Sequence, residues 1–138
     1  MSDKVREEKS RREYLTIDEI KKLASTECKH EIIKQAFMFS CMCGLRVSDI
    51  RKLKWGDMQT QGDKTKIEIK MQKTKEPLYL PISKNALRWL PERQNANDND
   101  LIFPLSHEGT INDNLQRWAN AAKIKKHISF HIARHTHA

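Results

Sequence analysis

The feature that most constrains the fold of this chain is an apolar stretch between Lys29 and Cys43. Its apolar side chains fall on almost every side of a helix instead of forming one stripe: Ile32, Ile33, Ala36, Phe37 and Phe39. A helix of this kind is normally buried, so the segment is predicted to be the central helix of a domain. Gly44 follows it directly and is expected to end it in the left-handed conformation that glycine adopts most easily.

Shorter amphipathic helices are expected on both sides of the central one. Thr16 and Glu19 have the spacing of a capping box and predict a helix that begins there. The segment after Gly44 predicts a short helix whose apolar face carries Val47, Ile50 and Leu53, with basic residues on its other side. Three more helices are expected towards the C-terminus: from Ser83 to about Leu90, from Thr110 to about Ala122, and from Ser129 to the end.

Between Gln61 and Ile82 the spacing of apolar residues changes from the helical period to alternation. This pattern predicts an antiparallel hairpin that turns at residues 73–76, with a third short strand near residues 57–61. Lys73 shares the register of the apolar residues, so its side chain is expected to lean towards whatever the sheet packs on. The predicted fold class is therefore α+β, a mainly α-helical domain with a small antiparallel hairpin or three-stranded sheet.

Length and composition indicate one domain. Of the 138 residues, 1–13 alternate acids and bases and are expected to form a charged linker or arm, and 14–138 the domain. The cysteines form no CxxC pair and are expected to be buried free thiols: Cys28, Cys41 and Cys43. No apolar stretch is long enough for a membrane span, so a cytoplasmic protein is expected.

The net charge of +8 and the pI of about 9.5 favour a polyanionic partner, above all nucleic acid. Charge alone does not exclude an ordinary basic domain. Two faces, together with Lys75 in the hairpin turn, are expected to contact DNA phosphates. They consist of Arg51, Lys52 and Lys54 in the short helix, and of Lys123, Lys125 and Lys126 in a basic turn.

Four cationic side chains are candidates for a phosphate-binding site: Arg46, Lys73, His131 and Arg134. His131 and Arg134 are three residues apart, so on a helix both side chains can reach the same point. An arginine can donate to two phosphate oxygens at once, which suits this set to a phosphate group. The alternative is that these are surface side chains in ordinary salt bridges, or solvated lysines in the turn.

The histidines allow a rival interpretation. His127, His131 and His135 are spaced four residues apart and His137 follows, as in a metal-binding stripe on one helix face. No cysteine or acidic residue lies among them, and Arg134 would place a cation beside any bound metal. The spacing therefore favours a metal site less than a phosphate site.

Three motifs together resemble the tyrosine recombinase, or phage integrase, family: GLRVSDI at residues 44–50, QKTKEPLYLPI at residues 72–82, and HIARHT at residues 131–136. In that family the first arginine follows a Gly-Leu pair, with an acidic residue three positions later. The lysine lies on a hairpin, and the second cluster has the pattern His-x-x-Arg-His. Each motif is weak alone, but the ordered set is specific. The resemblance runs from about Tyr14 to the last residue and implies the family's catalytic-domain fold.

The resemblance also implies a role for each candidate cation. Arg46 and Arg134 would hold the non-bridging oxygens of the scissile phosphate. Lys73 would protonate the departing 5′ oxygen, and His131 would act as acid or base near the nucleophile. Fixed cations of this kind stabilise a phosphoryl-transfer transition state without a metal, so no cofactor is expected.

Asp49 and His135 are implied as supporting residues, Asp49 by orienting the cluster. The family's tyrosine nucleophile has no counterpart in the chain, because Tyr14 lies at the domain entrance and Tyr79 on a strand. We therefore expect a fragment of a catalytic domain, without the family's N-terminal DNA-clamping domain and C-terminal tyrosine segment. Such a fragment is expected not to form the covalent 3′-phosphotyrosine bond.

The leading hypothesis is that the parent protein is a site-specific recombinase of a mobile element. It would break and rejoin DNA strands through a 3′-phosphotyrosine intermediate during integration or recombination. The alternative is a non-catalytic DNA-binding module derived from the same fold. The expected partners are double-stranded DNA and, in the full-length protein, other recombinase protomers, with no membrane. In a prokaryote the expected location is the cytoplasm, in association with the nucleoid.

Overall fold

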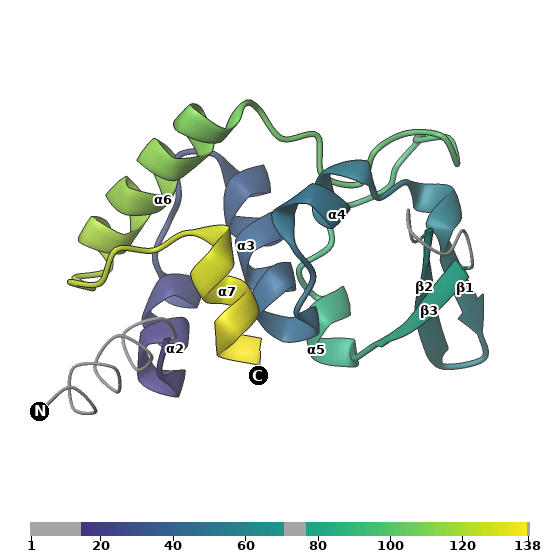
Figure 1. Cartoon of the computed structure of the whole chain (residues 1–138), viewed down its shortest axis with the longest axis horizontal. Helices are drawn as coiled ribbons and strands as arrows, with labels where there is room; N and C mark the ends of the chain where they lie inside the picture. Colours follow the sequence, from purple (N-terminus) through teal and green to yellow (C-terminus); the bar gives the residue numbers. More distant parts are fainter. Residues whose placement is uncertain (1–14, 71–76, 138) are drawn as a thin grey trace, which may run out of the picture.

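Helix α3 (Glu31–Cys43) runs through the middle of the molecule, as its apolar pattern predicts (Figure 1). The computed structural model describes residues 15–70 and 77–137, without the side chains of Lys70, Arg134, His135 and His137. The other elements are α2 (Ile17–Ser25), α4 (Val47–Lys52), the 3₁₀ turn η1 (Trp55–Asp57), β1 (Met58–Gln61), β2 (Lys64–Lys70), β3 (Pro77–Ile82), α5 (Lys84–Leu87), α6 (Glu108–Ala121) and α7 (Phe130–His137).

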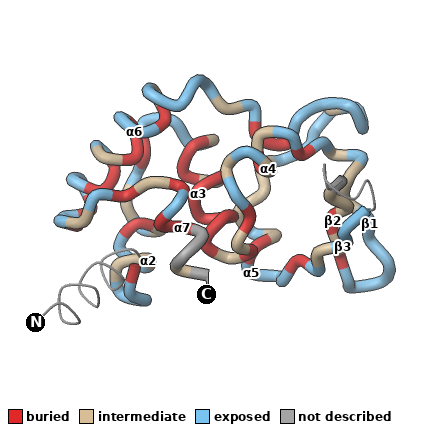
Figure 2. Tube along the Cα trace, in the orientation of Figure 1, coloured by how far each residue is buried: buried red, intermediate tan, exposed pale blue. Residues whose placement is uncertain are grey.

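The core is built around α3, which packs against α4, α5, α6 and α7. Phe37 on α3 is fully buried and meets Trp118 of α6 edge-on, with 5.5 Å between ring centroids. Its ring also contacts Phe130 of α7 at 5.8 Å. Helices far apart in the sequence therefore converge on one aromatic cluster, which places the start of α7 next to α3. Figure 2 shows this concentration of buried residues along α3 and α7.

The corner between α3 and α4 forms as the sequence predicts. Gly44 has φ 78°, the left-handed conformation, and its N–H donates to the carbonyl of Ser40 at 2.8 Å. The hydroxyl of Ser40, which is fully buried, donates to the carbonyl of Leu45 at 2.7 Å. These two bonds fix the backbone immediately before Arg46.

The sheet has three antiparallel strands in the order β1-β2-β3, which confirms the predicted hairpin and third strand. Ile67 pairs with Leu80 and is fully buried, whereas Leu78 nearer the tip of β3 is half exposed. The predicted turn at residues 73–76, with Lys73 and Lys75, lies outside the described residues. In Figure 1 the sheet extends away from the helical body on the side of α4 and α5.

Two helix boundaries differ from the sequence-based prediction. Ser83 caps α5 as expected, but the α-helix ends at Leu87 instead of near Leu90. Beyond Leu87 the last backbone N–H groups, up to Leu90, make i→i+3 hydrogen bonds. Pro91 follows, and a proline disfavours the α-helical conformation of the residue before it. Helix α6 begins at Glu108 and is capped by His107, so the predicted start at Thr110 was two residues late.

The placement of side chains around α4 also differs. Ile50 and Leu53 are buried as predicted. Arg51, however, lies one turn after Val47, and both line the same pocket, whereas it was expected on the opposite side of the helix with Lys52 and Lys54.

Two contacts join α2 to the C-terminal part of the chain. The N–H of Leu15 donates to the hydroxyl of Thr136 on α7 at 2.8 Å. Lys126 donates to Glu19 at 2.8 Å, and Glu19 also completes the predicted capping box with Thr16. In the described parts of the chain, no helix is long and apolar enough to cross a lipid bilayer.

Candidate functional site

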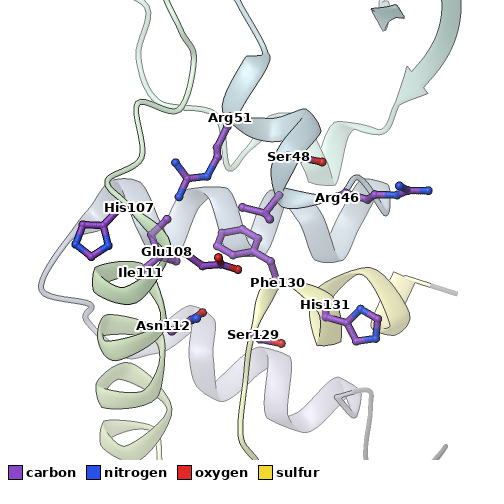
Figure 3. Close-up of a pocket in the computed structure, with 11 residues that line it drawn as sticks. Arg46, Ser48, Arg51, His107, Glu108, Ile111, Asn112, Ser129, Phe130 and His131 are labelled. Atoms are coloured by element: carbon purple, nitrogen blue, oxygen red, sulfur yellow. The ribbon is translucent and has the colours of Figure 1, made fainter. Parts of the chain in front are cut away.

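A pocket of about 700 Å³ lies where α4, the start of α6 and the start of α7 meet (Figure 3). It brings together segments that are far apart in the sequence. The residues that line it are Arg46, Val47, Ser48, Arg51, His107, Glu108, Ile111, Asn112, Ser129, Phe130 and His131. Two of the four predicted phosphate-binding cations, Arg46 and His131, are among them.

Arg46 occupies the N-cap position of α4, directly after the fixed Gly44–Leu45 corner. Its carbonyl accepts the N–H groups of Asp49 at 3.1 Å and Ile50 at 3.0 Å, which starts the helix. Its own side chain is exposed. The backbone that carries Arg46 is thus rigidly held, while its guanidinium remains accessible to a ligand.

His131 lies in the first turn of α7 and is also exposed. The neighbouring Phe130 is buried in the aromatic cluster with Phe37, which anchors this end of the helix. The carbonyl of Ser129 accepts the N–H groups of Ile132 and Ala133, at 3.1 and 3.2 Å. In the view of Figure 3 the side chains of Arg46 and His131 lie on the same side of the pocket.

His107 forms the opposite wall and caps α6 with its imidazole ring. Its Nδ1 accepts the N–H of Gly109 at 3.2 Å, and its Nε2 lies 3.1 Å from the hydroxyl of Thr110. A Cβ at position 109 would come within 3.1 Å of the imidazole carbon Cε1. Glycine therefore leaves room for the ring to lie across the helix start.

Arg51 crosses from α4 to the segment that precedes α6. Its Nη2 donates to the carbonyl of Ser106 at 2.6 Å, and its Nη1 lies 3.5 Å from the carbonyl of Leu105. The expectation that Arg51 contacts DNA is not tested by this geometry. It does show that the guanidinium is occupied by main-chain acceptors.

A family model described as the phage integrase family matches residues 13–138. The chain belongs to this family. Its architecture, mixed helices with a small three-stranded antiparallel sheet, is that of the tyrosine recombinase catalytic domain. The predicted family and fold class are therefore confirmed.

Three solved structures illustrate the likeness. The XerH site-specific recombinase bound to difH substrate has a TM-score of 0.69 and 18% identity, covering 90% of this chain and 41% of its own. XerA recombinase has a TM-score of 0.68 and 22% identity, and the match covers 90% of this chain and 47% of XerA. The lambda integrase catalytic core has a TM-score of 0.61 and 19% identity, and the match covers 91% of this chain and 80% of the core. The chain thus spans less than half of the XerH and XerA structures. No curated protein sequence matches it.

Several residues expected at the site of this integrase-family domain remain untested predictions. Lys73 and Lys75 lie outside the described residues, as do the side chains of Arg134 and His135. Asp49 is half-buried in the first turn of α4, three residues after Arg46.

The basic turn at residues 123–127 lies at the far end of α6 from the pocket (Figure 1). The length of α6, 14 residues, puts about 20 Å between this turn and the α6 wall of the pocket, whereas Ser129 of the pocket lining follows the turn closely in the sequence. Lys123 and Lys125 are exposed, whereas Lys126 is half-buried and paired with Glu19. The three lysines of this turn are not among the residues that line the pocket, whereas Arg51 of the α4 face is.

The α6 wall of the pocket is not among the sites predicted from the sequence. His107, Glu108 and Asn112 line it, and Ser48 and Ser129 contribute hydroxyl groups from α4 and α7. A signal for this wall exists in the sequence. An acidic residue three positions before the apolar periodic run that begins at Ile111 indicates a helix start, and a helix N-terminus presents polar groups to its surroundings.

The buried thiols are unsuited to chemistry. Burial raises the pKa of Cys41 to about 12 and that of Cys43 to about 11, so both stay protonated and unreactive at neutral pH. Within residues 15–70 and 77–137, no three His, Cys, Asp or Glu side chains are grouped closely enough to hold a metal ion. The side chains of His135 and His137 fall outside that search.

Tyr79 lies on β3, outside the pocket, and its hydroxyl donates to Glu68 at 3.2 Å. The negative charge of Glu68 and this hydrogen bond raise the pKa of Tyr79. A raised pKa disfavours the phenolate that attacks a phosphate. The position and the electrostatics of Tyr79 both argue against its serving as the nucleophile.

Proposed function

We propose that this chain supplies the phosphate-binding half of a site-specific tyrosine recombinase, which breaks and rejoins DNA strands through a 3′-phosphotyrosine intermediate. The observation that supports this proposal is that Arg46 and His131 line one pocket, although they lie far apart in the sequence. Both belong to the motifs that carry the resemblance to the family. A surface salt-bridge role would not require them to converge.

In this proposal Arg46 and Arg134 hold the non-bridging oxygens of the scissile phosphate. His131 acts as acid or base near the nucleophile, and Lys73 protonates the departing 5′ oxygen. The roles of Arg46 and His131 agree with their exposed side chains on the pocket wall. Cations held by a rigid backbone stabilise charge that develops on the phosphate without first having to reorganise.

Two residues support these cations in the proposal. Asp49 follows Arg46 in the first turn of α4, where a carboxylate can orient the guanidinium. His135 follows Arg134 on α7 and assists from outside the set of direct phosphate contacts. No metal enters the proposed reaction, because the charges that Mg²⁺ supplies in other phosphoryl transfers come here from side chains.

The proposed partners are double-stranded DNA and further recombinase protomers. The XerH structure contains its difH substrate, and a lambda integrase dimer is bound to a COC′ core site, with 22% identity and a TM-score of 0.61. The proposed DNA contacts outside the pocket are Lys52 at the end of α4, Lys54 directly before η1, Lys75, and the basic turn with Lys123, Lys125 and Lys126. The proposed setting is a mobile element in a prokaryotic cytoplasm, on the nucleoid.

The nucleophile is proposed to come from outside the described residues, since Tyr79 is neither in the pocket nor electrostatically suited. The chain itself is expected not to cleave DNA. A suicide DNA substrate, in which cleavage traps the enzyme, tests this directly. A covalent protein–DNA adduct on denaturing gels would contradict the expectation.

The function is tested by DNA binding and its dependence on salt. We expect Arg46→Ala to weaken binding to a duplex about tenfold and to reduce the slope of log affinity against log salt by about 0.9, the share of one phosphate contact. Its thermal unfolding should be nearly unchanged, because an exposed side chain contributes little to stability. Arg88→Ala, an exposed arginine at the end of α5, is the matched control. Loss of stability with unchanged DNA affinity in Arg46→Ala would refute the assignment.

A further inference from the structure

Arg51 differs from the other basic residues of α4 in what its charge touches. Lys52 is exposed, whereas the Arg51 guanidinium reaches the backbone before α6. The Nη2 contact to Ser106 is short, 2.6 Å, and the Nη1 contact to Leu105 is at the long limit of a hydrogen bond, 3.5 Å. Both carbonyls belong to the same stretch, so one fork-shaped donor group engages two successive acceptors.

These contacts compete with a DNA contact. Hydrogen bonds from a guanidinium are charge-assisted and belong to the stronger ones in proteins. To reach a phosphate, Arg51 would have to release the carbonyl of Ser106.

The backbone that Arg51 holds leads directly into the α6 wall of the pocket. Ser106 is followed by His107, whose ring caps Gly109 and whose carbonyl accepts the N–H of Ile111 at 3.2 Å. Figure 3 shows Arg51 extending from α4 towards this helix start, away from Arg46. Helix α4 thus carries Arg46 at its first end and, through Arg51, fixes the opposite pocket wall with its last turn.

We propose that Arg51 is a positioning residue of the pocket: it ties residues 105–106 to α4 and so sets the place of the α6 start opposite Arg46, without contacting DNA itself. The DNA part of this proposal rests on the proposed function. A lysine cannot substitute, because a single ammonium group lacks the planar fork that spans two carbonyls. The role replaces the phosphate contact expected for Arg51.

The first measurement is amide hydrogen exchange of the free 138-residue chain in three variants. In Arg51→Met and Arg51→Lys, the N–H groups of Gly109 and Ile111 should exchange about tenfold faster, as expected for loss of a charge-assisted hydrogen bond. The N–H of Ile102, bonded to Leu53 at 2.9 Å, is the internal reference and should not change. Lys52→Met, which removes the neighbouring charge, should leave all three unchanged.

The second measurement is binding to a duplex of about 30 base pairs over a range of salt concentrations. If Arg51 acts through the α6 wall, Arg51→Met and Arg51→Lys both weaken binding, about fivefold. A phosphate contact would instead be largely rescued by lysine, which binds phosphate as a point charge. Thermal unfolding confirms that each variant is folded, and Arg51→Lys serves if Arg51→Met is not.

Two results would overturn the proposal. Unchanged exchange together with restored affinity in Arg51→Lys would assign Arg51 to DNA contact. Faster exchange with unchanged DNA affinity would reduce Arg51 to a structural tie. Failure of the wild-type chain to bind DNA is a separate outcome, because it refutes the proposed function whatever the exchange shows, and with it any role of Arg51 in a DNA site.

Discussion

The helical body and the three-stranded sheet are stabilised by contacts of different range. In the body, Phe37 touches Trp118 and Phe130, which lie far along the chain. In the sheet, each strand pairs with its neighbour in the sequence. Figure 2 shows the same difference in burial, with α3 mostly buried and much of the sheet exposed or intermediate. Within the sheet, Ile67 on β2 is fully buried, whereas Leu78 on β3 is 49% exposed.

This difference separates two tasks of the fold. Arg46 and His131 meet only because the body folds as a whole, so their geometry depends on the long-range core. The register of β2 and β3 is determined by pairing of adjacent strands, and the sheet enters the core mainly through Ile67 and Ile82. We therefore expect changes in the body to alter both stability and the pocket, and changes in the sheet to stay local.

The largest expected effect is that of Phe37→Ala. Removing a fully buried ring between two aromatic partners should lower the free energy of unfolding by about 3–5 kcal/mol. Leu78→Ala, in the sheet, should change it by less than about 0.5 kcal/mol because that side chain is half exposed. Urea denaturation measures both. Phe37→Leu gives a milder test if the alanine variant does not fold. Equal losses of stability at the two positions would contradict the proposed difference between body and sheet.

A smaller effect is expected from two positions with the same backbone conformation but opposite residue types. Lys123, at the end of α6, has φ 62°, and Gly62, between β1 and β2, has φ 61°. The left-handed conformation is strained for any residue with a Cβ and easy for glycine. Lys123→Gly should therefore stabilise the body by about 0.5–1 kcal/mol, and Gly62→Ala should destabilise by about 1 kcal/mol.

Neighbouring atoms do not complicate the interpretation of Gly62→Ala and Lys123→Gly. A Cβ at position 62 would meet nothing within 4 Å, so the alanine tests backbone strain alone. Around Lys123, the N–H of Lys123 donates to Asn120 at 3.0 Å and that of Ile124 to Ala119 at 2.9 Å, a Schellman arrangement that glycine favours. Lys125→Gly is the control for loss of a neighbouring charge, and it should not stabilise.

The sequence predicts best where one local rule decides the outcome. The capping box at Thr16, the left-handed Gly44 and the alternating strands all follow from short-range patterns, and the structure confirms them. The start of α6 was missed because its cap is a histidine, which is not among the usual N-cap residues. That the Gly109 backbone leaves room for the ring depends on three-dimensional packing.

The candidate site shows the same limit. Arg46 and His131 could be placed together from the sequence only through resemblance to a family, because no local pattern links two residues so far apart. The bond from Arg51 to Ser106 depends on how the loop after residue 91 returns to α4, which spacing cannot give. Helix periodicity placed Arg51 on the solvent side, because a pattern of polar and apolar residues does not distinguish an arginine that lines a pocket from one that faces solvent.

The smallest expected effect concerns a surface contact in each region. In the body, burial alone would raise the pKa of Glu19, but the hydrogen bond and charge of Lys126 and the bonds from Thr16 outweigh it and lower the pKa below its ordinary 4.5. Because the folded pKa is the lower one, the carboxylate adds stability above the unfolded value, and this is lost as pH falls through the folded pKa. Glu19→Gln should cost about 0.5 kcal/mol at pH 7 and nothing in acid.

The control variants separate the ion pair from the cap and from the sheet. Glutamine still completes a capping box, so Glu19→Gln removes only the charge that pairs with Lys126. Asp18→Asn removes a neighbouring exposed charge from the same helix turn and should show less pH dependence. In the sheet, Tyr79 bonded to Glu68 has a raised pKa, so its contribution is lost at alkaline pH instead. Urea denaturation across pH should therefore show opposite trends: the loss of stability in Glu19→Gln should disappear in acid, and that in Tyr79→Phe at alkaline pH. The same trend in both variants would contradict this difference between the two surface contacts.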